Sequence, residues 1–276
     1  MSQADDVQQA GAPPVQTAAA APPRKGKARA RTQGLALRLA LPAAFLLAWA
    51  LASASSEQIA AVLPGPVTVL VTLAGLAATG ELFGHVAASL QRAFAGFAVA
   101  GALGIGLGLA MSQSRFLNEL FNGPVELLRP ISSIAWIPLA ILWFGIGFRS
   151  VVFVIVVSCV FIILLNTVAA ARTVREDLLD AARTLGASPT QLFTKVTLPS
   201  ALPGIMLGLR IAMTGAWGGV LIAEMIATRE GLGYMIVRAQ ASFRPDIVIG
   251  GMVAVGLVGY VLNRLFLVLQ RRITHV

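Results

Sequence analysis

Long apolar segments limit most strongly what this chain of 276 residues can fold into. A helix needs about 20 mostly apolar residues to cross a bilayer. The sequence offers six such segments, at residues 34–54, 86–111, 116–145, 151–171, 204–227 and 247–269. Only 12% of the residues are charged, against about 25% in soluble domains. The sequence therefore predicts an all-α, polytopic membrane protein with six transmembrane helices.

These segments divide the chain into three expected parts. Residues 1–33 are rich in Ala and Pro and end in a basic stretch, so we expect a disordered, basic cytoplasmic tail. Residues 34–85 hold the first transmembrane helix and an outer lead-in, with a turn predicted at Leu63-Pro64-Gly65-Pro66. Residues 86–270 form the core, in which Pro130 and Pro138 are expected to break the third helix.

The distribution of Lys and Arg predicts that both termini lie in the cytoplasm. Six of the 21 Lys and Arg residues lie from Arg24 to Arg38, just before the first apolar segment, as expected of a cytoplasmic flank. The interval between the fourth and fifth segments is also basic on its inner side. Four arginines depart from this rule and fall outside: Arg149, Arg229, Arg238 and Arg244.

One long polar interval, residues 171–203, interrupts the apolar pattern. Thr173 and Glu176 fit a capping box that would begin a helix, and Gly186 suits a left-handed helix end. Ser188-Pro189-Thr190-Gln191 fits the start of a second helix. Pro199 and Pro203 are expected to stop it. The interval thus predicts a structured, water-facing loop over residues 172–199.

Glycines recur in the second apolar segment. Gly104 and Gly108 form a G-x-x-x-G pattern, which lets two membrane helices approach closely. The spacing G-x-G-x-x-G of dinucleotide-binding sites is absent, and no strand precedes these glycines. We therefore expect close helix packing here.

Catalytic and metal-binding motifs are missing from the sequence. It contains no P-loop, no G-x-S-x-G, no H-E-x-x-H and no C-x-x-C. Its one cysteine and two histidines are far apart in the chain. The net charge of +9 gathers at a membrane flank, which does not indicate a nucleic-acid partner. We expect no enzyme activity, no cofactor and no metal in this chain.

The polar interval resembles the EAA loop of permease subunits of ABC importers. The matching residues are Asp180-Ala181-Ala182, Gly186-Ala187 and Leu198-Pro199-Ser200-Ala201-Leu202-Pro203, with Asp180 where the family has Glu. In that family the short helix after the glycine docks into a groove of a separate ATPase. The resemblance implies an ATPase-coupling role for Asp180, Ala181, Ala182, Gly186, Ala187, Ser188, Gln191, Phe193, Leu198 and Pro199.

Further motifs resemble one subgroup, the permeases for taurine, aliphatic sulfonates, nitrate and similar small solutes. They are Leu63-Pro64-Gly65-Pro66, Ser89-Leu90-Gln91-Arg92, Arg129-Pro130-Ile131, Ile137-Pro138-Leu139, Leu142 to Gly147, Gly208-Leu209-Arg210, Ala223-Glu224-Met225 and Gly231-Leu232-Gly233-Tyr234. The resemblance implies the type I importer permease fold and alternating access driven by the ATPase. It also implies an external solute-binding protein, periplasmic or lipid-anchored, a second permease subunit in a homodimer, and a bacterial inner membrane.

Polar residues within the apolar segments are candidates for a translocation pathway, because burying them in a bilayer is costly. They are Ser132, Ser133, Trp136, Asn166, Arg210, Thr214, Trp217 and Glu224. Each residue type also has a structural role that would explain it without a pathway. Hydroxyl groups bond to their own helix, and Trp favours the membrane interface. Arg210 would snorkel from an inner helix end, and Glu224 would pair with an outer arginine. An anionic solute would suit Arg129 or Arg210.

Two other classes compete with an importer permease. An ion-coupled secondary transporter often has discontinuous helices, and Pro138 is compatible with one, but no internal repeat is visible and the polar loop would have no purpose. A membrane enzyme or scaffold is the third class, and the missing catalytic motifs argue against an enzyme.

Overall fold

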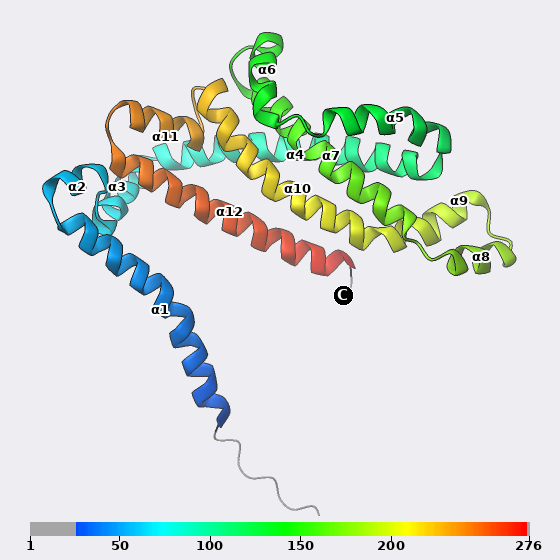
Figure 1. Ribbon diagram of the computed structural model, residues 1–276, viewed down its shortest axis with the longest axis horizontal. Coiled ribbons are helices and arrows are strands. Elements are labelled where there is room, and N and C mark those ends of the chain that lie inside the picture. Colours follow the sequence, from blue (N-terminus) through cyan, green and yellow to red (C-terminus); the bar gives the residue numbers. More distant parts are fainter. Residues whose placement is uncertain (1–25, 275–276) are drawn as a thin grey trace, which may run out of the picture. The chain divides into compact units, whose positions relative to one another are not determined.

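Helices form nearly the whole of residues 26–274, the part of the chain that the computed structural model describes, and no strand occurs in this range (Figure 1). The chain divides into two units, residues 1–49 and 50–276. The first holds most of helix α1, and the second holds the other helices. They are α1 (Gly26–Ala54), α2 (Glu57–Val62), α3 (Pro66–Ala78), α4 (Glu81–Gln113), α5 (Arg115–Leu128), the 3₁₀ helix η1 (Ser133–Trp136), α6 (Ile137–Phe144), α7 (Phe148–Arg172), α8 (Glu176–Thr184), α9 (Pro189–Gln191), the π-helix η2 (Leu192–Thr197), α10 (Leu198–Ala227), α11 (Leu232–Ala241) and α12 (Pro245–Thr274).

The core of the second unit lies where α7 packs between α4 and α10. Small residues allow this contact. A Cβ atom added to Gly104 of α4 would lie 2.8 Å from the Cβ of Ile163, and one added to Gly108 would lie 2.8 Å from that of Thr167. The close packing predicted from the G-x-x-x-G pattern is confirmed. Gly208 of α10 approaches Asn166 of α7 in the same way.

Five helices of the described residues are long and apolar enough to cross a membrane, or six if one bent pair forms a single span. The bent pair is α5 with η1–α6, whose axes meet at 91°. The predicted break therefore exists, but it falls at residues 129–132 beside Pro130. Pro138 does not interrupt the chain, because it lies in the first turn of α6, where a missing N–H costs little.

The beginning of the chain differs from the expectation. Helix α1 already includes residues 26–33, which the sequence predicts as part of the tail, whereas residues 1–25 lie outside the described part. Within the residues of α1 whose side chains are described, the apolar stretch is Ala40–Ala54, and the start of the predicted span 34–54 lies outside them. The predicted outer lead-in contains Glu57–Ala78, which is long and apolar enough to cross. The predicted turn separates α2 from α3 inside it, with Gly65 as N-cap and Pro66 in the first turn.

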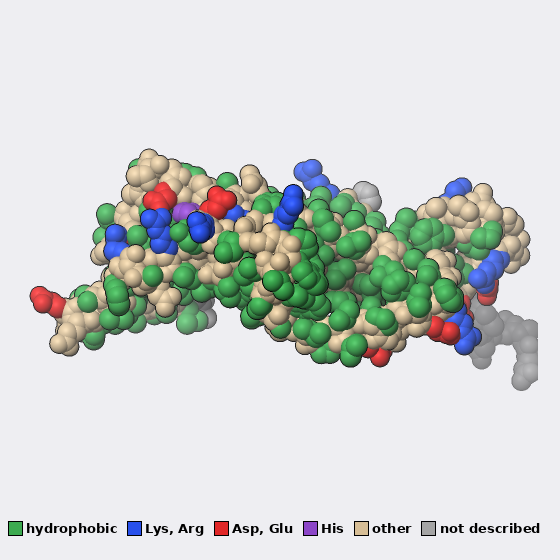
Figure 2. Space-filling model, turned by 90° about the horizontal axis from the view of Figure 1, so that it is seen from above, with side chains coloured by type: hydrophobic (Ala, Val, Ile, Leu, Met, Phe, Trp, Pro, Cys, Tyr) green, Lys and Arg blue, Asp and Glu red, His purple; other side chains and the backbone are tan. Residues whose placement is uncertain are grey.

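Short helices lie at the two ends of the long helices in the second unit. Helices α8 and α9 lie at one end of α7 and α10, and α11 lies with α2 and α3 at the other (Figure 1). Figure 2 shows a broad hydrophobic surface between charged side chains that lie mostly toward the two ends. This is the pattern expected of a protein whose middle faces lipid.

Candidate functional site

The turn after α8 is a complete Schellman motif. The N–H of Gly186 donates to the carbonyl of Arg183 at 2.9 Å, and the N–H of Ala187 donates to that of Ala182 at 3.0 Å. Gly186 has φ +79°, so the predicted left-handed helix end is confirmed. The bonds satisfy carbonyls at the end of α8 and hold the turn in one conformation.

The predicted capping box at the second helix is also confirmed. The Gln191 N–H donates to Ser188 Oγ at 3.3 Å, and the Ser188 N–H donates to Gln191 Oε1 at 2.9 Å. On α8, Arg183 Nη1 lies 2.9 Å from Asp180 Oδ1, so the aspartate is engaged within its own helix. Both side chains are exposed, and such a pair stabilises a helix only slightly.

The capping box predicted at Thr173 and Glu176 is wrong. Helix α7 extends to Arg172, and Thr173 ends it, with its hydroxyl donating to the Ala170 carbonyl at 3.0 Å. Helix α8 begins at Glu176 after Arg175, which makes no side-chain cap. Helix α7 ends one residue beyond the predicted segment 151–171, so Thr173 is its C-cap and not the start of the next helix.

The proline stop is also wrong. Pro199 and Pro203 both lie inside α10, and Pro189–Ala227 is one helical run of 39 residues. The π-helix η2 makes this possible: the Leu198 N–H donates to the Phe193 carbonyl, five residues back. Pro199 follows in the first turn of α10, where its missing N–H is tolerated. Short π segments are frequent at functional sites.

The apolar face of α8 is largely uncovered in this chain. Leu185 is 88% exposed and Leu178 is 46% exposed, although both lie at the end of the molecule where polar side chains gather. Phe193 is half-buried. These leucines therefore leave an uncovered apolar surface on a loop whose turn and cap are hydrogen-bonded. The ten residues predicted to couple to an ATPase all lie in this segment, from α8 to the first turn of α10.

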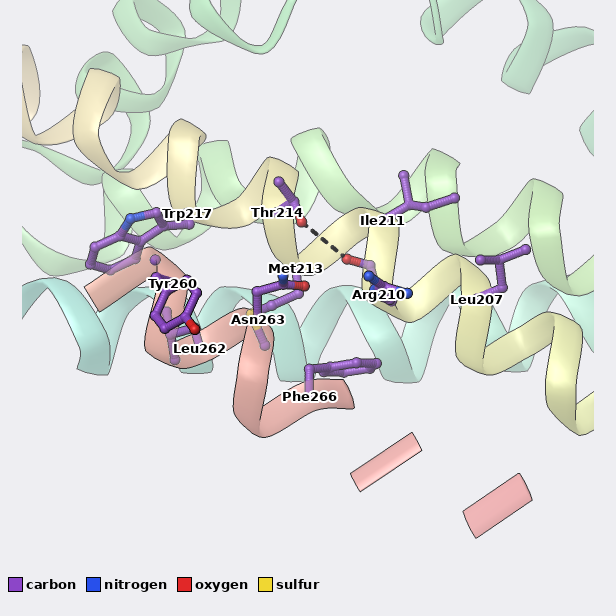
Figure 3. A pocket seen from close by; sticks show the side chains of 11 residues that line it. Leu207, Arg210, Ile211, Met213, Thr214, Trp217, Tyr260, Leu262, Asn263 and Phe266 are labelled. Carbon is purple, nitrogen blue, oxygen red and sulfur yellow. Dashed lines mark hydrogen bonds between the residues drawn. The ribbon is translucent and has the colours of Figure 1, made fainter. Parts of the chain in front are cut away.

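The predicted pathway residues do not form one site. Arg210, Thr214 and Trp217 line a cavity of about 530 Å³ between α10 and α12 (Figure 3). Ser132, Ser133 and Asn166 line a second cavity of about 350 Å³, between the break after α5 and α7, together with Arg129. Trp136 packs its ring edge against Phe153, with centroids 6.2 Å apart.

The competing structural roles hold for part of this set. Thr214 donates to the carbonyl of Arg210, and Asn166 donates to that of Ile162, each within its own helix. Arg210 lies near the middle of α10, because the helical run begins at Pro189 and not at the predicted residue 204. Its reach to the membrane interface stays a prediction.

Glu224 lies in a third place, a buried cluster between the first turns of α4 and the last turn of α10, at the ends predicted to face outward. Its carboxylate is fully buried and 2.8 Å from Nη1 of Arg92, whose side chain is 2% exposed. Glu224 does pair with an arginine, but the partner is Arg92 of the second apolar segment and not one of the four arginines expected outside. Ser89 Oγ donates to Glu224 Oε2 at 2.8 Å, and the Gly233 N–H donates to the same oxygen at 3.1 Å. The charge is therefore paired and hydrogen-bonded, as a buried charge must be.

The loop before α11 completes this outer cluster, defined as His85, Ser89, Arg92, Glu224 and the backbone of residues 230–233. Arg92 also donates to the carbonyl of Glu230 at 2.9 Å, and the Leu232 N–H donates to Ser89 Oγ at 2.9 Å. The Gly231 N–H donates to His85 Nδ1 at 3.1 Å. A side chain at residue 231 would overlap the carboxylate of Glu224. The glycines of the Gly-Leu-Gly-Tyr motif thus let the backbone approach the buried acid.

Sequence reasoning missed Arg92, Ser89 and His85 as site residues. A usable signal existed, because an arginine and a glutamate within apolar segments must find partners. The chain offered several arginines for Glu224, however, and only the packing of α4 on α10 selects Arg92.

Membrane-length helices, cavities between them that hold polar side chains, and a capped polar loop are the features of a membrane transport subunit. Residues 102–275 match the family model of the binding-protein-dependent transport system inner membrane component. The chain belongs to this family of ABC transporter permeases.

Named relatives extend this finding. A putative ABC transporter permease of Methanocaldococcus jannaschii is 38% identical over 238 residues, covering 84% of this chain and 89% of the relative. A putative aliphatic sulfonates transport permease of Bacillus subtilis is 34% identical, covering 85% of each. A bicarbonate transport system permease of Synechococcus elongatus is 34% identical, covering 89% of this chain and 91% of the relative.

The fold matches solved permeases. A chain of the inward-facing MetNI methionine ABC transporter superimposes with a TM-score of 0.60 at 20% identity, covering 67% of this chain and 93% of that one. The likeness shows that this chain has the fold of an ABC importer permease.

Proposed function

We propose that the chain is the permease of an importer for a small anion, driven by a separate ATPase that binds the loop from α8 to η2. The observation that carries this proposal is the rigid loop with uncovered leucines, Leu178 and Leu185. Its turn and cap are fully hydrogen-bonded, so the loop would move as a rigid body when the ATPase displaces it. A solvated loop without a partner would gain nothing from exposing these side chains.

Movement of this loop would reach the membrane through one helix. The run Pro189–Ala227 contains α9, η2 and α10 without an intervening loop. A helix transmits displacement along its axis with little loss, whereas a flexible connection absorbs it. ATP-driven closure of the ATPases would thus shift α10 and the residues on it, opening the pathway alternately to each side.

The names of the relatives and the arginines in the cavities both favour an anion as the solute. The named relatives transport aliphatic sulfonates and bicarbonate, which are both anions. Arg210 and Arg129 line the two membrane-level cavities, and neither has an ion-pair partner among the described residues. We propose the pathway along these cavities, with Ser132, Ser133, Asn166, Thr214 and Trp217 in their walls and Trp136 and Glu224 nearby.

The other subunits of the importer are inferred from the family to which the chain belongs. We propose a homodimer of this permease, two ATPase subunits, and a periplasmic or lipid-anchored solute-binding protein, in a bacterial inner membrane. The loop from α8 to η2 would face the cytoplasm. Helix α12 runs antiparallel to α10 and ends toward the same side (Figure 1), which supports a cytoplasmic C-terminus. The N-terminus is proposed on that side too.

The test is purification of the tagged chain from its native membranes, with mass spectrometry of the proteins that accompany it. We expect a P-loop ATPase in equal amount, and crosslinking to it from Thr190→Cys. Recovery of the chain alone, with uptake driven by an ion gradient, would instead establish a secondary transporter.

Gly186→Val tests the coupling directly. Valine resists φ +79°, so the turn after α8 should lose its shape at a cost of about 1–3 kcal/mol. In proteoliposomes containing the assembled importer, uptake should fall while ATP hydrolysis persists. Gly186→Asn is the matched control, because asparagine tolerates a left-handed conformation, and it should retain most uptake. Normal uptake by the valine variant would contradict the proposed coupling.

A further inference from the structure

The α10–α12 cavity has an ordered interior. Along α10, Leu207 lies nearest the loop end and Trp217 nearest the outer end, with Arg210 and Thr214 between them (Figure 3). Along α12, Phe266 faces the inner part and Tyr260 the outer part, with Asn263 between them. The polar groups thus meet at mid-depth, and apolar side chains lie on both sides of them.

A hydrogen bond between α10 and α12 bounds the outer end of the cavity. Trp217 Nε1 donates to the carbonyl of Val255 at 3.1 Å, which joins α10 to α12. Gly259 makes this approach possible, because an added Cβ would lie 2.9 Å from Trp217 Nε1. The indole therefore forms a rigid wall.

The charge inside the cavity is positive and uncompensated. Arg210 forms no ion pair among the described residues, and no carboxylate lines the cavity. Arg264, next to Asn263 on α12, is held by Tyr260: its Nε lies 3.0 Å from the Tyr260 hydroxyl and its guanidinium lies 5.2 Å from the ring centroid. A cation at membrane depth without a partner is costly and marks a pathway or a ligand site.

Hydrogen-bonding capacity remains available beside Arg210. The bond from Thr214 Oγ1 to the Arg210 carbonyl is 3.4 Å long, beyond the usual range for a hydroxyl donor. Its proton is thus only weakly held. The Asn263 side chain is exposed to the same space. Guanidinium, amide and hydroxyl groups together match an oxyanion with several acceptor oxygens.

We propose that this cavity is the membrane binding site for a small organic monoanion, of the alkanesulfonate kind. The head group would bind Arg210, Asn263 and Thr214, and the short apolar body would lie against Ile211 and Phe266. A volume of about 530 Å³ falls within the range of small-molecule sites. The inference rests on the proposed transport function and assigns its solute site.

The helix that carries Arg210 favours this cavity over the one lined by Arg129. Arg210 lies on the same helical run as the loop, so movement of the loop would displace it relative to α12. Arg129 follows α5, and a 91° break separates its helix from α6. A site on α10 and α12 can therefore be opened by the loop without any change within α7.

A thiol placed in the cavity tests its charge without requiring transport. Asn263→Cys introduces one accessible cysteine, because the native Cys159 is fully buried. The importer in lipid nanodiscs is treated with two membrane-impermeant methanethiosulfonates, one anionic (2-sulfonatoethyl) and one cationic (2-trimethylammonioethyl). We expect the anionic reagent to react faster, and Arg210→Gln to lower the anion-to-cation rate ratio roughly tenfold, as loss of a nearby unit charge predicts.

Arg129→Gln is the matched control and should leave this rate ratio unchanged. We also expect 1-butanesulfonate to protect the thiol from the cationic reagent better than bicarbonate does. An unchanged ratio in Arg210→Gln, or a thiol that reacts with neither reagent, would overturn the site. Equal protection by bicarbonate would overturn the organic class of the ligand. If no ATPase accompanied the purified chain, the rates of thiol modification could still be measured. The proposed ATP-driven function and the proposed anion site can therefore fail separately.

Discussion

Two arginines within the membrane helices are held in opposite ways. Arg92 on α4 is buried, paired with Glu224 and bonded to the loop before α11. Arg210 on α10 faces a cavity and has no ion-pair partner among the described residues. Glu224 and Arg210 lie on the same helix, so the two environments arise along one element. The first arrangement joins helices, and the second leaves a charge available to a ligand.

The difference shows that a charge in a membrane segment is not by itself evidence of a pathway. A buried charge that is paired and hydrogen-bonded, as Arg92 is through both Nη atoms, contributes to assembly, and a solute could reach it only by breaking those bonds. A charge without a partner needs either water or a ligand. Substitutions should therefore affect stability at the outer cluster and transport at the α10–α12 cavity.

Arg92→Leu should have the largest effect on stability. It leaves the Glu224 carboxylate buried without its cation, which destabilises folded proteins by about 3–5 kcal/mol. The measurement is the thermal unfolding midpoint of the purified chain in detergent, with membrane yield as a second readout. Arg115→Gln is the control, because its pair with Glu119 is exposed and contributes about 0–1 kcal/mol. Equal unfolding midpoints for both variants would show that the buried Arg92–Glu224 pair stabilises the fold no more than the exposed Arg115–Glu119 pair.

Ser89→Ala should destabilise less. It removes a donor to Glu224 and leaves the buried Leu232 N–H without its acceptor, at a cost of about 1–3 kcal/mol. Hydrogen exchange of the amides of residues 231–233 should accelerate, whereas exchange in α8 should not. Unchanged exchange at Leu232 would mean that the loop is held by other contacts.

Arg210→Gln should lower solute uptake about tenfold, equivalent to about 1.4 kcal/mol, with an unfolding midpoint close to that of the natural chain. Arg210→Lys keeps the charge but loses the planar fork, so its uptake should be intermediate and its apparent KM raised. Uptake by reconstituted importer is the measurement. A large loss of stability in Arg210→Gln would place this arginine in the same structural class as Arg92.

Local features of the loop were predictable from the sequence because their chemistry lies within a few residues. A left-handed glycine and a reciprocal Ser188–Gln191 cap depend on near neighbours in the chain. Hydropathy located most of the spans for a similar reason, since each helix satisfies its own backbone in lipid. The same local rules failed at Pro199, because the π-helix before it lets the helical run continue into the turn that holds this proline.

The sequence by itself determined a helical membrane permease, its polar loop and the set of polar residues that need an explanation. Only the tertiary structure decided which of these polar residues pair with one another and which face a cavity. Glu224 and Arg92 are far apart in the chain, and the packing of α4, α7 and α10 brings them to 2.8 Å. The same packing leaves Arg210 facing a cavity. Local patterns cannot decide this, because the energy of a buried charge depends on what the other helices place beside it.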